Sequence, residues 1–382
     1  MRFFFLLFPF ISSAQPDSID YLLNWDQCGF TQDFSLDGLP EYNFDQLKAD
    51  LAPELSDAEV LNTIFKENRG GGIIFFLKGP YIFDRGIRIP SNFVLSGKHR
   101  DSTFFIFDEM KVERDLFLAQ GKLTDEEYEV DVIPKAGSDF VVLLTTTALK
   151  PNDWVLLKGE DEDLVTSSWA KGKTGQILRV KQVKGKHVYF DNGLRREYSG
   201  QAKLIKMIPA QNVGITDVTI MSTQETELQI SNIQFRLAVN CFVAGICSKQ
   251  SNYAHVLLEY ASNCLVLDSD FKDGHSYGAG GKAYGVVMQF ATGECLVKNN
   301  HFDHLRHAML VQAGANGNIF KNNTSVNPYW KEFWLPKHAA GDIVLHGNYS
   351  YYNMFLDNTI QNLVIDNSHG KSGPNNFFVR NR

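Results

Sequence analysis

The sequence predicts an all-β solenoid, a parallel β-helix, and two repeating features of its C-terminal half lead to this prediction. Five segments open with apolar residues at strand spacing, and their starts differ by 31, 23, 35 and 23 residues: Leu265, Leu296, Ile319, Met354 and Phe377. The shortest interval is about one coil, and the longer ones leave room for loops. Each segment then reaches a polar pair, and the second members are Ser269, Asn300, Asn323, Asn358 and Asn381. Asparagines stacked at one turn can hydrogen-bond to the coils above and below.

An N-terminal helix is predicted to close one end of the coil stack. Ser56 and Glu59 match a capping box, and apolar residues follow on one helical face: Val60, Leu61, Ile64 and Phe65. Three glycines end this helix, and short strands separated by turns come next: Ile73–Phe76, Tyr81–Phe83, Ile87–Ile89 and Phe93–Leu95. Such a helix covers apolar residues and backbone groups that would otherwise face water.

Residues 108–205 lack the repeat of the coils, and their pattern of short apolar strands separated by charged turns predicts a small antiparallel β insertion. Charged turns separate their strands: Phe140–Leu144, Trp154–Lys158, Gln176–Val180 and His187–Phe190. We therefore divide the chain into a signal peptide (1–14), an N-terminal cap with the first coils (15–107), the insertion (108–205) and the main coils (206–382). Because the fifth repeat stops at Arg382 and no cap follows, we expect a chain truncated at its C-terminus.

The N-terminus predicts export. A basic start precedes the apolar run Phe3–Ile11, and small residues follow up to Ala14. This pattern is a short signal peptide with cleavage after Ala14, too short to span a bilayer. We therefore expect a monomeric protein that is secreted, periplasmic or on the cell surface and has no integral membrane segment. The net charge of −7 argues against nucleic acid as the main partner.

The five cysteines leave two interpretations open. Cys241, Cys264 and Cys295 each begin a strand line, so they can stack on successive coils. That spacing would permit a disulfide between neighbours, or a buried column of free thiols. We favour free thiols, because nothing in the chain is typical of a small disulfide framework.

The helix, the stretches Gly70–Tyr81 and Ile89–Gly97, and the asparagine turns together resemble a known group. They are similar to the secreted right-handed parallel β-helix proteins of the pectate-lyase superfamily, in which a Gly-rich stretch, a strand and a Pro/Gly turn open the first coil. The resemblance covers most of residues 45–382 and implies a right-handed coil. It implies no single reaction, because the group contains lyases, hydrolases, epimerases and non-catalytic proteins.

A second set of strands precedes the asparagine segments, and each contributes one polar residue to a column. In each strand three apolar residues are followed by a polar one: Glu259, Gln289, Gln312, His346 and Asp366. The column shares its face with the middle apolar residue of each strand, because side chains alternate. We expect this face to point outward, since an inward column would be a buried polar ladder needing partners for every member. An outward stripe would suit the repeated hydroxyls of a glycan.

The loops beside this column are rich in histidine, basic and aromatic residues: His275, Lys282, His304, Arg306, His307, Tyr329, Trp330 and Tyr349. Counted from each turn, three of them hold matching places, so we expect them to be neighbours: His275, Arg306 and Tyr329. Aromatic rings beside polar groups suit the stacking of sugar rings. Three nearby histidines at spacing three (His301, His304 and His307) cannot share one face of a strand or helix, so we predict no metal ion there.

The leading hypothesis is a lyase that cleaves a uronate-containing polysaccharide by β-elimination. That reaction needs a cation for the carboxylate, a base for the C5 proton and an acid for the leaving oxygen. Arg306 would be the cation, His307 or His304 the base, and His346 or Tyr349 the acid. Substrate would contact the remaining candidates: His275, Lys282, Gln289, Gln312, Tyr329, Trp330 and Asp366. A calcium ion could replace Arg306, but no compact carboxylate cluster commits the chain to one, so we commit to no cofactor.

Two alternatives stay open. A glycoside hydrolase of the same fold would need two carboxylates across the bond, and the candidates are Asp268, Asp270, Asp303, Asp342 and Asp366. A non-catalytic surface protein would use the polar column to bind a glycan.

Overall fold

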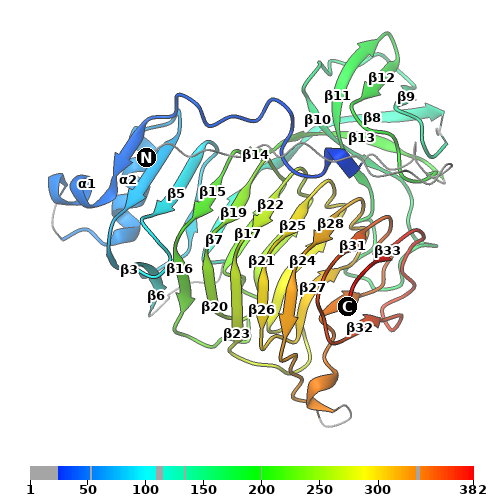
Figure 1. The fold of residues 1–382 in the computed structure, drawn as a ribbon. Coiled ribbons are helices and arrows are strands. Elements are labelled where there is room, and N and C mark those ends of the chain that lie inside the picture. Colours follow the sequence, from blue (N-terminus) through cyan, green and yellow to red (C-terminus); the bar gives the residue numbers. More distant parts are fainter. Residues whose placement is uncertain (1–24, 52–53, 109–114, 133–134, 199, 333–335) are drawn as a thin grey trace.

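The protein is a parallel β-helix built from three long sheets. The structure, a computed structural model, describes residues 25–51, 54–108, 115–132, 135–198, 200–332 and 336–382. Successive coils pass through the three sheets in turn and stack along one axis (Figure 1). The signal peptide predicted at 1–14 lies outside the described residues. The first sheet, sheet A, contains β1 (Glu41–Asn43), β2 (Gly72–Phe76), β5 (Phe93–Gly97), β15 (Gly214–Thr216), β19 (Phe242–Ala244), β22 (Leu265–Leu267), β25 (Leu296–Lys298), β28 (Ile319–Lys321), β31 (Met354–Leu356) and β33 (Phe377–Val379).

The other two sheets of the β-helix are also parallel. Sheet B contains β3 (Gly79–Phe83), β6 (Thr103–Phe107), β16 (Thr219–Ser222), β20 (Cys247–Ser251), β23 (Asp270–Gly274), β26 (His301–Asp303) and β29 (Thr324–Val326). Sheet C contains β4 (Ile87–Arg88), β7 (Phe117–Gln120), β17 (Ile233–Arg236), β21 (Ala254–Glu259), β24 (Tyr284–Gln289), β27 (His307–Val311), β30 (Ile343–Leu345) and β32 (Leu363–Ile365). A short pair, β14 (Ala210–Gln211) and β18 (Ala238–Val239), lies beside them.

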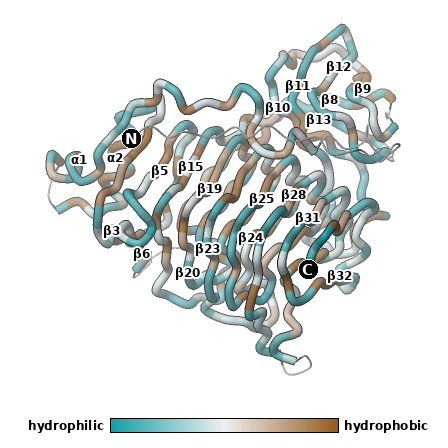
Figure 2. The backbone as a smooth tube through the Cα atoms, viewed as in Figure 1, coloured by the Kyte–Doolittle hydropathy of each residue, from teal (hydrophilic) through white to brown (hydrophobic). Residues whose placement is uncertain are grey.

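The core of the β-helix fills with inward-facing apolar side chains in aligned rows. Phe271 and Phe302 stack with ring centroids 5.2 Å apart, and Phe355 stacks on Phe320 at 4.9 Å. Apolar positions recur at the same place on neighbouring coils, as Figure 2 shows. The column of Cys241, Cys264 and Cys295 is fully buried in this core, and the three thiols are free, as predicted.

The predicted asparagine column is a continuous hydrogen-bonded ladder. The side chain of Asn323 donates to Val297 O at 3.0 Å and to Asn358 Oδ1 at 2.9 Å. Its Oδ1 accepts from the backbone N and the Nδ2 of Asn300, both at 3.0 Å. A second ladder, which the sequence interpretation missed, runs through Asn318, Asn353 and Asn376. Each amide therefore satisfies backbone groups that the turn would otherwise leave unpaired inside the protein.

The predicted capping helix packs on the first coil, together with a shorter helix that we did not predict. Among the residues that the structure describes, the α-helices are α1 (Phe44–Asp50) and α2 (Asp57–Glu67), and short 3₁₀ turns lie at Trp25–Gln27 and Lys337–Ala339. Ser56 Oγ accepts from the Glu59 backbone N at 3.3 Å, and Glu59 Oε2 accepts from the Ser56 backbone N at 2.9 Å, so the capping box is present. The four predicted apolar residues of α2 are all buried in the main core. Within the described residues, no helix combines the length and the apolar character needed to cross a bilayer.

The antiparallel insertion is a closed six-stranded barrel outside the coil stack (Figure 1). It contains β8 (Lys122–Val132), β9 (Phe140–Leu143), β10 (Trp154–Lys158), β11 (Gln176–Lys184), β12 (His187–Phe190) and β13 (Lys203–Ile208). The structure places β7 in sheet C although it falls within the predicted insertion 108–205, so the barrel begins later than expected. A buried ion pair joins barrel to coils: Arg195 Nη2 contacts Glu294 Oε1, and Arg195 Nη1 donates to Asn316 Oδ1 at 2.9 Å.

Candidate functional site on the outer face of sheet C

The polar column predicted from the sequence lies in register on sheet C. Glu259 pairs directly with Gln289, and the strand registers that follow place Gln312, His346 and Asp366 next in line. The column faces outward, as expected. The apolar residues that share its face form a cluster separate from the main core: Leu257, Val287, Leu310 and Val344.

The first members of the column are nevertheless almost covered, and they form a ladder. Glu259, Gln289 and Gln312 are only 7%, 6% and 5% exposed. Gln312 Nε2 donates to Gln289 Oε1 at 2.5 Å, and Gln289 Nε2 donates to Glu259 Oε1 at 2.5 Å. Gln234 Nε2 donates to the other oxygen of Glu259 at 2.9 Å. The glutamines therefore hold one another and a carboxylate in place, instead of forming the open stripe we expected.

An aromatic and cationic cluster surrounds His307, the first residue of β27, the strand that Gln312 follows. The ring centroid of His307 lies 5.0 Å from that of Tyr284, its register partner on β24. The Arg306 guanidinium stacks over Trp330 at 3.9 Å from the ring centroid and lies 5.4 Å from Tyr284. Arg306 Nη1 donates to Gly278 O at 2.7 Å, while its Nε has no hydrogen-bond partner among the described residues.

The surroundings of His307 keep its imidazole neutral. Its Nδ1 lies 3.2 Å from the carbonyl oxygen of Gly341, which can only accept a hydrogen bond, so Nδ1 carries the proton. The other nitrogen, Nε2, therefore keeps its lone pair. Burial holds the pKa of His307 well below its ordinary value, and the positive charge of Arg306 adds to the shift.

Tyr284 is the complementary group, because it stays protonated. Burial raises the pKa of its phenol above the ordinary value, and the nearby Arg306 charge opposes this shift only in part. A neutral imidazole and a protonated phenol thus lie side by side, next to a guanidinium. The sequence interpretation assigned no role to Tyr284, although its register with His307 follows from the same strand alignment.

A second histidine group lies next to the first. The ring centroids of His307 and His346 are 6.1 Å apart, and those of His346 and His369 are 4.6 Å apart. His346 Nδ1 lies 2.7 Å from Asp366 Oδ2, which is within hydrogen-bonding distance, but the angle between the two groups does not meet hydrogen-bond geometry. The interaction between them is therefore electrostatic. Three of the four predicted catalytic residues, Arg306, His307 and His346, are brought together here.

The fourth, His304, belongs to a different cluster. Its Nδ1 lies 2.8 Å from Asp273 Oδ1 and 2.9 Å from Tyr277 Oη, and its ring packs on Tyr329. No contact joins His304 to His307 among the described residues. His304 is close to His307 in sequence, but it lies in the turn before β27, and its side chain contacts a different set of residues.

Of the other residues predicted to contact substrate, some lie next to Arg306 and others do not. Tyr329 N donates to Leu305 O, so Tyr329 follows the Arg306 coil as predicted, whereas His275 N donates to Ser251 O on an earlier part of the stack. His275 is therefore not the predicted neighbour of Arg306, because the loop at 276–283 intervenes. Lys282, in the same loop, forms an ion pair with Glu227: its Nζ lies 2.8 Å from Glu227 Oε2.

Tyr349 packs away from His307, in a cluster with Tyr351 and the Arg196 guanidinium. Among the described contacts of Tyr349, none reaches the imidazole of His307. The phenol that the structure sets beside His307 is that of Tyr284, not that of Tyr349, the acid considered from the sequence.

The aspartates considered for hydrolysis do not form a pair. Asp270 pairs with Arg100 at 2.8 Å, and Asp342 is 1% exposed, where it accepts from the backbone of Gln361 and Asn362. Asp268 and Asp303 accept from the asparagines of neighbouring turns, so within the described chain only Asp366 of this set faces outward on sheet C.

A different carboxylate, Asp115, precedes β7 and interacts electrostatically with Glu259. Burial raises the pKa of Asp115 to about 6, and burial also raises that of Glu259. Either group can therefore hold a proton more readily than an ordinary carboxyl.

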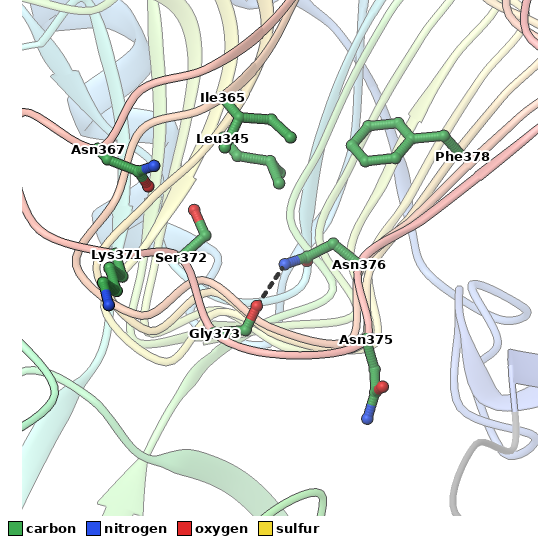
Figure 3. A pocket seen from close by; sticks show the side chains of 9 residues that line it. All are labelled: Leu345, Ile365, Asn367, Lys371, Ser372, Gly373, Asn375, Asn376 and Phe378. Atoms are coloured by element: carbon green, nitrogen blue, oxygen red, sulfur yellow. Dashed lines mark hydrogen bonds between the residues drawn. The ribbon is translucent and has the colours of Figure 1, made fainter.

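A pocket at the C-terminal end of the stack is distinct from this face. It is lined by the inward side chains of Leu345 and Phe378 and by polar residues of the last loop, where Asn376 Nδ2 donates to Gly373 O (Figure 3). It continues the interior of the coils, whereas Asp366 projects from the outer face.

The fold and its outward polar face define a parallel β-helix protein with a candidate site on sheet C. No protein-family model and no curated protein matches the chain. Among solved structures, it is similar to the tailspike protein gp49 from Pseudomonas phage LKA1, with a TM-score of 0.63 and 15% identity over 85% of this chain and 61% of that one. It is also similar to the tailspike gp61 of Pseudomonas phage phi297, with a TM-score of 0.62 and 14% identity over 89% of this chain and 59% of that one. The chain thus spans about three fifths of each tailspike, and the similarity shows the shared fold.

Proposed function

We propose that the protein cleaves a uronate-containing polysaccharide by β-elimination at the His307 cluster. One observation carries the proposal: a neutral imidazole, a protonated phenol and a guanidinium meet at His307, Tyr284 and Arg306 on the outer face of sheet C. These are the three kinds of group that the reaction requires. The resemblance of the sequence to the pectate-lyase superfamily supports a glycan as substrate, while the choice of reaction rests on the site and not on the fold.

The roles follow from the protonation states. His307 Nε2 takes the proton from C5 of the uronate, and the electrons of that C–H bond form the C4–C5 double bond. The C4–O bond breaks, and Tyr284 gives its phenolic proton to the leaving oxygen. Arg306 stabilises the negative charge that develops on the carboxylate during proton removal. Solvent then returns a proton to Tyr284 and removes one from His307.

The test uses a panel of polyuronates and neutral glycans, read for two products. The proposal expects ultraviolet absorbance from unsaturated uronate ends with at least one polyuronate. His307→Ala should lose at least about a hundredfold in rate, and Tyr284→Phe at least about tenfold. His301→Ala on β26 of sheet B is the matched control and should keep the rate. Absence of absorbance with every polyuronate, or full activity of His307→Ala in a folded protein, would overturn the proposal.

Hydrolysis is a second candidate, favoured by the raised pKa values of Asp115 and Glu259. A protonated carboxyl could act as general acid while the other carboxylate acts as base. In that case new reducing ends would form without ultraviolet absorbance. Glu259→Gln would then abolish cleavage, whereas His307→Ala would leave it unchanged.

A further inference from the structure

We propose that His346, Asp366 and His369 form a binding site for a divalent transition-metal ion such as Zn²⁺. One ligand atom from each residue lies within 4.8 Å of those of the other two, and all three side chains are half-buried. Ligand atoms around a tetrahedral zinc ion lie about 3.4 Å apart, given bonds of about 2.1 Å, so small side-chain rotations would close the site. Two imidazoles and a carboxylate favour zinc and its neighbours over Ca²⁺ or Mg²⁺, which prefer oxygen ligands.

The carboxylate is already oriented for this role. Asp366 Oδ1 accepts from the backbone N of Ser368 at 2.8 Å, which fixes one oxygen in a turn of the chain. The other oxygen, Oδ2, faces His346 Nδ1 at 2.7 Å. The hydrogen bond from Ser368 therefore orients the carboxylate before an ion arrives.

The loop that carries His369 is held against the strand that carries His346. Gly370 N donates to Asn367 O at 3.0 Å and closes a turn around His369. Gly347 has a φ of +69°, and a Cβ at this position would lie 2.4 Å from Gly370 O. Only glycine therefore lets the loop come this close, and the two imidazoles meet edge to face with ring centroids 4.6 Å apart.

Three protein ligands leave at least one coordination position for water or another ligand. The site borders the His307 cluster but does not depend on the proposed lyase reaction, because ion binding can be measured directly.

The experiment uses the full chain without a histidine tag, treated with a chelator and then freed of it. Titration calorimetry with ZnCl₂ at neutral pH should show one ion per chain. His369→Ala should weaken binding at least about tenfold, and Asp366→Asn should also weaken it. Gly347→Ala keeps all three ligands but displaces the loop, so it should weaken binding as well.

The matched control is His187→Ala, which removes an exposed histidine on the barrel and should leave binding unchanged. The proposal fails if the wild type binds no zinc. It fails equally if His369→Ala and Asp366→Asn bind zinc as tightly as His187→Ala does. A lyase that works without zinc would leave the metal site intact, and a zinc site without lyase activity would leave only the metal proposal standing.

Discussion

The asparagine ladder should be a main source of the stability of the coil stack, and Asn323→Ala tests this directly. The side chain is 1% exposed and takes part in four hydrogen bonds, two as donor and two as acceptor. The substitution leaves the Asn300 backbone N and the Val297 carbonyl without this partner inside the turn. Each such buried group costs about 1–3 kcal/mol, so we expect a loss of about 4 kcal/mol in the free energy of unfolding.

The matched control is the neighbouring Asn322→Gly. Asn322 is exposed, its side chain makes no hydrogen bond to the described residues, and its φ of +54° suits glycine. We expect a change within about 0.5 kcal/mol. Urea unfolding, followed by circular dichroism and compared at the midpoint, measures both variants. If Asn323→Ala lost no more than Asn322→Gly, the ladder would be a consequence of stacking and not a cause of it.

Three further predictions concern buried charges. Burial lowers the pKa of His255 to about 3, below the ordinary 6.5. The unfolded chain thus takes up a proton that the folded chain refuses, and the free energy of unfolding should fall as the pH drops below about 6.5, with a flatter slope in His255→Leu. For Asp115 the pH dependence of stability has the opposite sign. Its raised pKa of about 6 contributes stability that is complete below about pH 3.8 and is lost as the pH rises through about 6. Urea unfolding at a series of pH values should show this loss of about 2 kcal/mol in the wild type and not in Asp115→Asn. Arg195→Met strands the buried Glu294 carboxylate and should cost about 3–5 kcal/mol by urea unfolding, whereas the exposed Lys203→Met should change little.

Features that depend on local pattern were predictable from the sequence. The capping box at Ser56 and the repeated asparagines each follow from a few neighbouring residues, and the structure confirms both. Strand β8 (Lys122–Val132) was missed, because most of its side chains are charged and exposed and only closure of the barrel makes it a strand. Its identity depends on distant partners that the local sequence does not reveal.

In the candidate site, too, some neighbours could be predicted from the sequence and others could not. Register brought Arg306, His307 and His346 together, because strand alignment fixes neighbours across coils. The path of a loop is not fixed in this way. His369 reaches His346 only through the close approach at Gly347, a contact between backbones that leaves no periodic signal. For the same reason His304, close in sequence, lies in another cluster.

The ladders also have a consequence for how such a protein can change over time. The ladder asparagines make the same hydrogen bond whether 23 or 35 residues separate them. The extra residues of the longer coil therefore form a loop between β29 and β30 and do not shift the strands on either side. Surface loops bordering sheet C can therefore lengthen, shorten or be exchanged while the scaffold keeps its phase. A lineage, or an engineer, could use this freedom to vary the rim around His307 without redesigning the coils beneath it.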